Sequence, residues 1–304
     1  MTAALWAAVF LLVALTLPPA AREAVPIAPS GDSHARFLSG AFHVHTTASD
    51  GGGTRDDVAR AAAAAGLDFV ILTDHGDGTA APAAPEYRHG VLLIDGVEVS
   101  TTRGHYAAFG LTQAPYPLGG PPYAVIDDVA RLGGVGAAAH PDSAKDDLRW
   151  REWSAPVGAM EVLNGDSAWR DEGAFALGRA LVAYPFRPAQ AMAALIQHPA
   201  ALLRRLDALN RSRRVVGLAG ADAHGRLPLT NDVEGDSGNW AIPVPSYRHA
   251  FSTIANVVEV DAEPGGDPSA DARVLIDAVR AGRVTMALTA MATPAALSFT
   301  ATTA

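Results

Sequence analysis

The stretch AFHVHTTASDGGGTRDDVARAAAAAGLDFVILTDH, residues 41–75, decides the fold of this chain. It opens on a short strand at 41–45, and Thr54 then stands where an N-cap residue would begin a helix. The alanine-rich run that follows favours a helix, and Gly66 is placed to end it. The continuous apolar run at 69–73 is typical of a parallel strand covered on both faces. The stretch therefore predicts a strand–helix–strand unit.

The same alternation of strands and helices continues along the chain. We expect further strands at 91–99, 136–139, 160–163 and 215–219, and further helices at 126–132, 172–182, 189–197, 200–209 and 272–281. Such alternation argues for βα units around a parallel sheet. With six or seven units in about 240 residues, the pattern favours a closed α/β barrel over an open sheet.

The two ends of the chain differ in composition from this region. Residues 3–17 are almost wholly apolar, and an apolar run of about 15 residues fits a signal-peptide core better than a membrane span of about 20. We expect a signal peptide or membrane anchor at 1–21 that engages the export machinery or the membrane, and hence an exported or membrane-tethered protein; a buried terminal helix is the alternative. Residues 22–38 read as a linker, 39–288 as the barrel, and 289–304 as the start of a truncated or short C-terminal β segment.

Composition limits the chemistry that the chain can perform. The formal net charge is −9 and Lys145 is the only lysine, so no broad nucleic-acid-binding surface is expected. The chain has no cysteine, which excludes disulfides, thiolate metal sites and cysteine nucleophiles. A metal ion would therefore be held by His, Asp and Glu, a set of ligands that suits Zn²⁺, Mn²⁺ or Fe²⁺.

Short polar clusters stand at the C-terminal ends of several of the apolar runs. They are His43-Val44-His45 with Asp50 behind it, Asp74-His75, Glu98, His140, and Asp222-Ala223-His224. Residues two apart on a strand point to the same face, so His43 and His45 can bind one ion. Asp222 and His224 have the same spacing. Imidazoles and carboxylates gathered at the ends of barrel strands predict a metal centre.

Glu98 lies inside an apolar strand, where a carboxylate is costly unless it is paired or binds a cation. A buried ion pair is the alternative to a ligand, and a carboxylate can also bridge two ions because each oxygen can serve one metal. Asp74 is either a helix N-cap or an acceptor that orients a ligand histidine. Asp50 is either a plain turn aspartate or part of a loop that folds over the site, and His105 is either a ligand or a pocket residue.

Three basic residues near strand ends are candidates for holding an anion, although isolated basic residues are more often solvated surface. They are Arg103, Lys145 and Arg170.

In motif order and content the chain resembles the PHP (polymerase and histidinol phosphatase) superfamily, over residues 38–288. The resemblance rests on Phe42–Gly51, Leu72–His75, Gly96–Glu98, Ala139–Pro141 and Ala221–His224. A weaker resemblance, at 163–170 and 280–284, is to the exported or carbamate-hydrolase-like branch of that superfamily.

The resemblance implies a distorted (β/α)₇ TIM-like barrel with two or three divalent metal ions. It implies that the first ion is held by His43, His45, Glu98 and Asp222, the second by Glu98 and His140 with His105 as a further candidate, and the third by Asp50, His75 and His224. Amidohydrolases also begin with His-x-His, but many bridge their metals with a carboxylated lysine, and Glu98 fits the bridging role better than Lys145.

The leading functional hypothesis is a metal-dependent hydrolase that attacks a small phosphate ester with a hydroxide generated between two ions. Its expected catalytic residues are Glu98, Asp222, His224 and Asp74. Two alternatives remain open: hydrolysis of a carbamate, ester or amide at the same centre, and a non-catalytic metal-binding scaffold.

Overall fold

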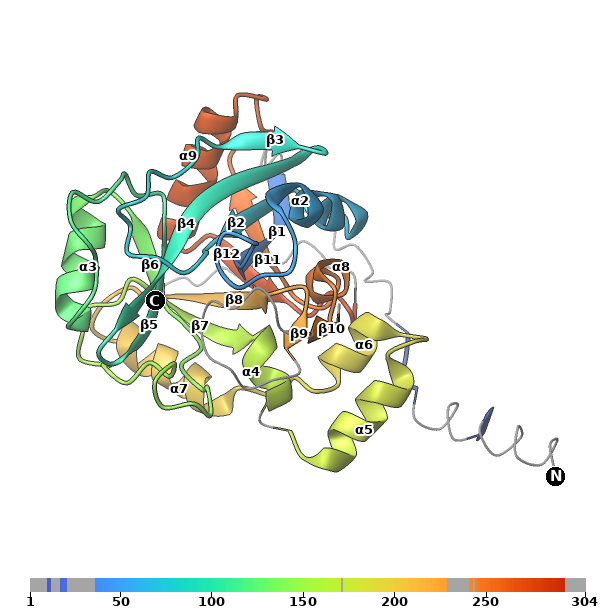
Figure 1. The fold of residues 1–304 in the computed structure, drawn as a ribbon. Helices are drawn as coiled ribbons and strands as arrows, with labels where there is room; N and C mark the ends of the chain where they lie inside the picture. Colours follow the sequence, from blue (N-terminus) through green and yellow to red (C-terminus); the bar gives the residue numbers. More distant parts are fainter. Residues whose placement is uncertain are drawn as a thin grey trace, which may run out of the picture.

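Seven strands close into a barrel in the computed structural model, which describes residues 10–11, 17–20, 36–170, 172–228, 241–242 and 244–292 (Figure 1). The strands follow the order β1 (Arg36–Val44), β2 (Phe69–Leu72), β4 (Val91–Thr101), β5 (Gly104–Phe109), β6 (Val135–Ala138), β7 (Ala159–Asn164) and β8 (Val216–Ala223). β8 pairs back with β1, which closes the ring. The predicted distorted α/β barrel is confirmed.

The distortion comes from β5, which is antiparallel to both of its neighbours, whereas the other pairs in the ring are parallel. No helix separates β4 from β5, because only Thr102 and Arg103 connect them. The prediction of one strand at 91–99 missed this hairpin. Because no turn was recognised before it, the apolar run 104–109 could not be separated from the preceding strand by its periodicity alone.

Three further strands of the same sheet lie outside the ring. β3 (Glu86–Arg88) pairs with β4, and β11 (Ala255–Val260) pairs antiparallel with the first half of β1, with β12 (Val284–Ala287) beyond it. Because Arg36–Gly40 pair with β11, β1 begins at Arg36 rather than at Ala41, and residues 36–38 of the predicted linker belong to a strand. Most of the predicted segments 1–21, 22–38 and 289–304 lies outside the described residues.

The helices agree with the predicted ones to within a few residues at most ends. They are α2 (Arg55–Ala64), α3 (Pro122–Arg131), α4 (Gly165–Arg170), α5 (Ala174–Ala183), α6 (Pro188–Ala193), α7 (Ala200–Asn210), α8 (Tyr247–Phe251) and α9 (Pro268–Arg280), and a small hairpin joins β9 (Leu227–Pro228) to β10 (Ala241–Ile242). α4 and α8 were not predicted; each has too few residues to show a period. None of the helices in the described part of the chain is long and apolar enough to cross a membrane.

The barrel interior is an apolar cluster to which every strand of the ring contributes. Its largest members are Phe42, Phe69, Ile71, Phe109 and Leu218, and Leu275 and Val279 of α9 pack against them. Leu92 and Ile94 of β4 belong to this cluster, and Glu98 follows on the same face by the two-residue period of a strand. The interior therefore changes from apolar to polar at the carboxyl ends of the strands.

The start of α2 has the predicted N-cap at Thr54, and Asp57 completes a capping box in which the side chains of the two residues each bind the other's backbone N–H. Thr54→Ala should lower the free energy of unfolding by about 1 kcal/mol, as the loss of an N-cap does in other proteins. Asp57→Ala should have a similar effect, and the double variant should lose less than the sum because the two bonds form one unit. Urea unfolding of the three variants tests this; full additivity would show that the box is not cooperative.

Candidate metal centre

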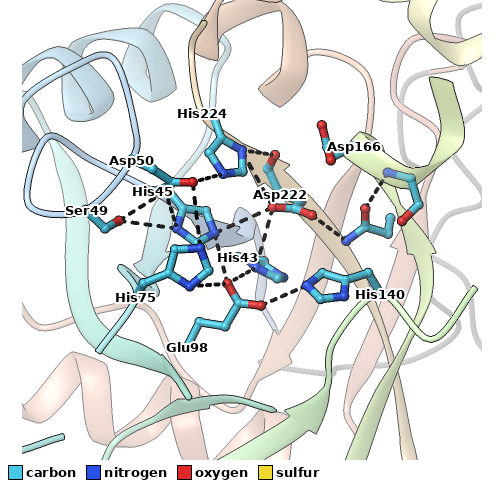
Figure 2. Close-up of polar contacts among 12 residues, drawn as sticks. His43, His45, Ser49, Asp50, His75, Glu98, His140, Asp166, Asp222 and His224 are labelled. Carbon is cyan, nitrogen blue, oxygen red and sulfur yellow. Dashed lines mark hydrogen bonds and ion pairs between the residues drawn. The ribbon is translucent and has the colours of Figure 1, made fainter. Parts of the chain in front are cut away.

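The eight predicted metal ligands converge at the carboxyl ends of β1, β2, β4, β6 and β8, as Figure 2 shows. They are His43, His45, Asp50, His75, Glu98, His140, Asp222 and His224. The structure also brings His105 into the cluster. The innermost members are buried, whereas His75 and Asp50 are partly open to solvent.

Four of these side chains direct one atom each toward a common point. The Nε2 atoms of His43 and His45 lie 3.1 and 3.3 Å from Glu98 Oε2, and each lies 3.5 Å from Asp222 Oδ1. Ligands about 2.0–2.1 Å from a tetrahedral ion are separated from one another by about 3.3 Å. The four atoms therefore have the spacing of a ligand shell.

In both imidazoles of this group, one buried nitrogen lacks a hydrogen bond within the described part of the chain. His43 Nε2 and His45 Nε2 are buried and have no hydrogen-bond partner among the described residues, because the nearby oxygens are close but poorly aligned. Unpaired polar atoms inside a protein are destabilising, and a metal ion is a partner that both lone pairs fit. The residues present thus fit a bound divalent cation.

The two carboxylate oxygens of Glu98 face two separate groups of histidines. Oε2 faces His43, His45 and, at 3.3 Å, His75 Nδ1. Oε1 lies 2.8 Å from His140 Nε2 and 2.9 Å from His105 Nδ1. A carboxylate whose two oxygens each meet a different set of nitrogens has the arrangement of a bridge between two ions.

The outer edge of the centre is formed around Asp50. Its Oδ2 lies 3.1 Å from His224 Nε2 and 3.7 Å from His75 Nε2, and its Oδ1 lies 3.3 Å from His45 Nδ1. Asp50, His75 and His224, the predicted third set of ligands, therefore lie together. They are also the members that a substrate can reach, since all three are partly exposed.

Unusual backbone conformations direct the ligand side chains to positions that a regular strand would not give them. His43, His140 and Asp222 have φ angles of 66°, 27° and 45°, and the pairing of β1 with β8 shifts register between Phe42 and Val44. Each such conformation costs on the order of 1–3 kcal/mol for a residue other than glycine. The simple i, i+2 rule therefore identified the correct pair of histidines, but an irregularity in β1 sets their final positions.

Glu161 on β7 is a member of the centre that the sequence analysis missed. His43 donates from Nδ1 to Glu161 Oε1 at 2.6 Å, while Oε2 accepts from the His140 backbone N–H at 2.6 Å and from Asn164 Nδ2 at 2.8 Å. Gly220 makes room for this carboxylate, because a Cβ there would lie 2.0 Å from Oε1. The available signal was the same as for Glu98, an acid within an apolar strand, but no histidine stands beside Glu161 in the sequence.

Asp74 contacts the loop that follows β1. Its carboxylate accepts from the Thr46 backbone N–H at 2.7 Å, from Thr46 Oγ1 at 2.8 Å and from Ser49 Oγ at 2.6 Å. Asp74 is thus neither a helix N-cap nor a direct partner of a ligand imidazole in the described interactions. Its contacts fix the loop that carries Asp50, and we assign it a positioning role instead of the predicted catalytic one.

Two further side chains hold the same loop, one from the segment after β8 and one from α8. Tyr247 donates its hydroxyl to the His45 carbonyl at 2.7 Å and accepts from the Gly53 N–H at 3.2 Å. Arg226 Nε donates to the Asp50 carbonyl at 2.9 Å. The loop is therefore held at its start, middle and end, which fixes the position of the Asp50 carboxylate.

Of the three basic residues considered as anion holders, Arg103 and Lys145 are exposed. Arg170 on α4 is exposed as well, and its guanidinium pairs with Asp166. Burial lowers the pKa of Arg170, but Asp166 and then Asp222 outweigh it and raise that pKa. Arg170 therefore lies within electrostatic reach of the metal ligands.

Proton and metal binding should compete in this centre. Burial lowers the pKa of His140, but its hydrogen bond and attraction to Glu98 outweigh burial and raise it to about 9. A raised histidine pKa stabilises the metal-free fold fully below the ordinary value of 6.5, and this stabilisation is lost as pH rises through about 9. Metal binding needs neutral imidazoles, so stabilisation by metal should increase over the same range.

We therefore expect the Tm of the metal-free protein to fall between roughly pH 6.5 and 9, and the increase in Tm caused by Zn²⁺ or Mn²⁺ to grow. Thermal unfolding of chelated and metal-loaded samples across this range measures both quantities. A metal-induced increase in Tm that is independent of pH would contradict this prediction.

Glu161→Gln should weaken metal binding by about 10–100-fold, as the loss of a partner that orients a ligand histidine does elsewhere. Glu161 accepts hydrogen bonds at both oxygens, whereas the amide of Gln would turn an NH₂ group toward either His43 Nδ1–H or the His140 N–H. Isothermal titration with Zn²⁺ gives the affinity. Glu259→Gln, an exposed glutamate on β11, is the matched control; equal affinities in the two variants would remove Glu161 from the centre.

Several solved structures are similar to this chain in overall fold. No family model matches the chain, and no curated protein sequence is similar to it. A two-domain protein from Bacteroides vulgatus, described as containing a predicted PHP-like metal-dependent phosphoesterase, is 17% identical at a TM-score of 0.46, over 89% of this chain and 70% of that one.

A putative metal-dependent phosphoesterase from Bifidobacterium adolescentis is 15% identical at a TM-score of 0.41, over 66% of this chain and 91% of that one. A lesion-specific endonuclease from Pyrococcus furiosus has the same identity and TM-score, over 79% of this chain and 56% of that one. Because the identities and TM-scores are all low, we base the assignment of the centre on its own geometry.

Proposed function

We propose that this protein is a divalent-metal-dependent hydrolase that cleaves a phosphate ester. The observation that carries the proposal is the position of Glu98, a buried carboxylate whose two oxygens face two separate sets of histidines. Divalent ions held by these residues would lower the pKa of a bound water and would neutralise charge on phosphoryl oxygens. A scaffold role would not need a bridging ligand of this kind.

Other residues of the chain would position the metal ligands and supply a proton to the leaving group. Glu161 and Asn164 hold His43 and Asp222 in place, since Asn164 Nδ2 donates to Glu161 at 2.8 Å and to Asp222 Oδ2 at 3.2 Å. In a centre with two ions on the other ligands, His75 and His224 are free at the partly exposed edge, where an imidazolium would protonate the leaving oxygen. In the metal-free centre burial and His45 lower the pKa of His224, but Asp50 and Asp222 outweigh them and raise it.

Two arginines near the edge of the centre favour an anionic substrate. Arg170 lies within electrostatic reach of Asp222, and Arg226 binds the loop that carries Asp50. A phosphate ester gains from a cation at this place, whereas a neutral carbamate or amide does not. A small phosphate ester is therefore the substrate class that we favour, and a carbamate, ester or amide remains the second candidate for the same centre.

Turnover should depend on metal and on Glu98 together. Protein loaded with Zn²⁺, Mn²⁺ or Fe²⁺ should hydrolyse a nitrophenyl phosphomonoester or phosphodiester, and Glu98→Gln should lose metal and at least about a hundredfold in turnover. Metal content and release of nitrophenol are measured on the same samples, with Glu259→Gln as the control. Undiminished hydrolysis after complete removal of metal would contradict the proposal.

The same assay with an aryl carbamate separates the two substrate classes. Arg170→Gln should raise KM for the phosphate ester and leave KM for the carbamate unchanged, since only the ester carries a charge. Faster turnover of the carbamate than of either phosphate ester, with no effect of Arg170→Gln, would replace the phosphoesterase by the second candidate.

A further inference from the structure

The most exposed large apolar side chains of the described part of the chain belong to two segments. They are Phe175 (81% exposed), Phe10 (76%), Leu181 (73%), Phe186 (61%) and Leu11 (58%). Phe10 and Leu11 lie in the apolar run 3–17, and the other three lie on α5 and the turn that follows it. Single exposed apolar residues need no explanation, but the grouping of the five in two segments does.

Helix α5 is apolar without being part of the core. Its sequence is AFALGRALVA, and only Ala183 is fully buried. Its main contacts are with α6, and in Figure 1 the α5–α6 pair projects from the side of the barrel. A helix on the surface of a soluble protein ordinarily exposes a polar face, and the exposed face of α5 has no apolar partner within the described part of the chain.

The two segments meet in the structure. Arg187, at the start of α6, donates from a guanidinium nitrogen to the Pro18 carbonyl at 2.5 Å. Pro18 directly follows the apolar run. The contact therefore places the end of that run at the α5–α6 pair.

Charge points to the nature of the partner. The chain as a whole carries 32 acidic and 23 basic residues. No Asp or Glu occurs between Gly173 and Leu206, and the α5–α6 part of this stretch carries Arg179 and Arg187. Apolar side chains combined with arginine and free of acidic residues suit the boundary between the headgroups and acyl chains of an anionic bilayer.

We propose that α5, with Phe175, Leu181 and Phe186, docks on the surface of an anionic lipid bilayer beside the N-terminal apolar run. The run alone is short for a stable span, and a second apolar contact from α5 increases the attachment, because membrane anchoring by two segments is far stronger than by one. The surface lies in the connection that leaves the carboxyl end of β7, the end of the barrel that carries the metal ligands. Tyr184, at the end of α5, bonds His249 of α8, and Tyr247 of α8 holds the loop of the metal centre, so docking by α5 attaches the protein on the side of the barrel that carries this centre.

Because the chain has no cysteine, a single introduced cysteine can be labelled at a chosen position. Nitroxide labels are attached to the full-length protein at Phe175→Cys and Leu181→Cys, and at Val274→Cys as control, an exposed apolar position on α9. Each sample is bound to vesicles of phosphatidylglycerol and phosphatidylcholine, and collision with oxygen and with a nickel chelate gives the depth of each label. We expect the labels at 175 and 181 to lie about 5–10 Å below the headgroups and the label at 274 to remain in water.

Several results would overturn the proposal. The labels at 175 and 181 could be as accessible to the nickel chelate as the label at 274, which would show that α5 does not touch lipid. Spin–spin broadening between labels at 175 without increased depth would show instead that α5 is a contact between two copies of the chain. Hydrolytic activity is not a readout here, so failure of the docking surface is distinguishable from failure of the proposed function.

Discussion

The structure depends on one buried carboxylate, that of Glu98, surrounded by imidazoles. A lone ionised carboxylate in the interior of a barrel would be strongly destabilising, since burial raises its pKa. His43, His105 and His140 reverse that effect and hold the pKa well below its ordinary value. The same carboxylate joins residues from β1, β4, β5 and β6, so the cation-binding end of the barrel is assembled around it.

Holding so many polar groups together has a cost in backbone geometry. Three ligands adopt positive φ angles, and β1 is irregular at His43. The apolar interior formed by Phe42, Phe109 and their neighbours compensates, because it fixes the strands on which the strained residues stand. The fold thus separates two tasks: the apolar half of the interior provides stability, and the polar half provides a site for cations.

The sequence predicted the features that rest on local chemistry. Thr54, Asp57 and Gly66 set the limits of α2, and polar residues at strand ends pointed to eight side chains that the structure brings together. It could not predict pairings set by distant segments, such as β11 on the first half of β1. The role of Glu161 was not predicted for a similar reason. Its partners His43 and Asn164 come together only when β1, β7 and β8 are adjacent.

The central claim is that His43, His45, Glu98 and Asp222 form a ligand shell around a divalent ion. The most direct measurement is anomalous X-ray diffraction at the absorption edge of the metal, from crystals of the metal-loaded protein. The claim predicts an anomalous peak about 2.0–2.2 Å from the Nε2 atoms of His43 and His45, and a second peak on the Oε1 side of Glu98. Absence of any peak within bonding distance of these atoms, in crystals where the cluster is intact, would contradict it.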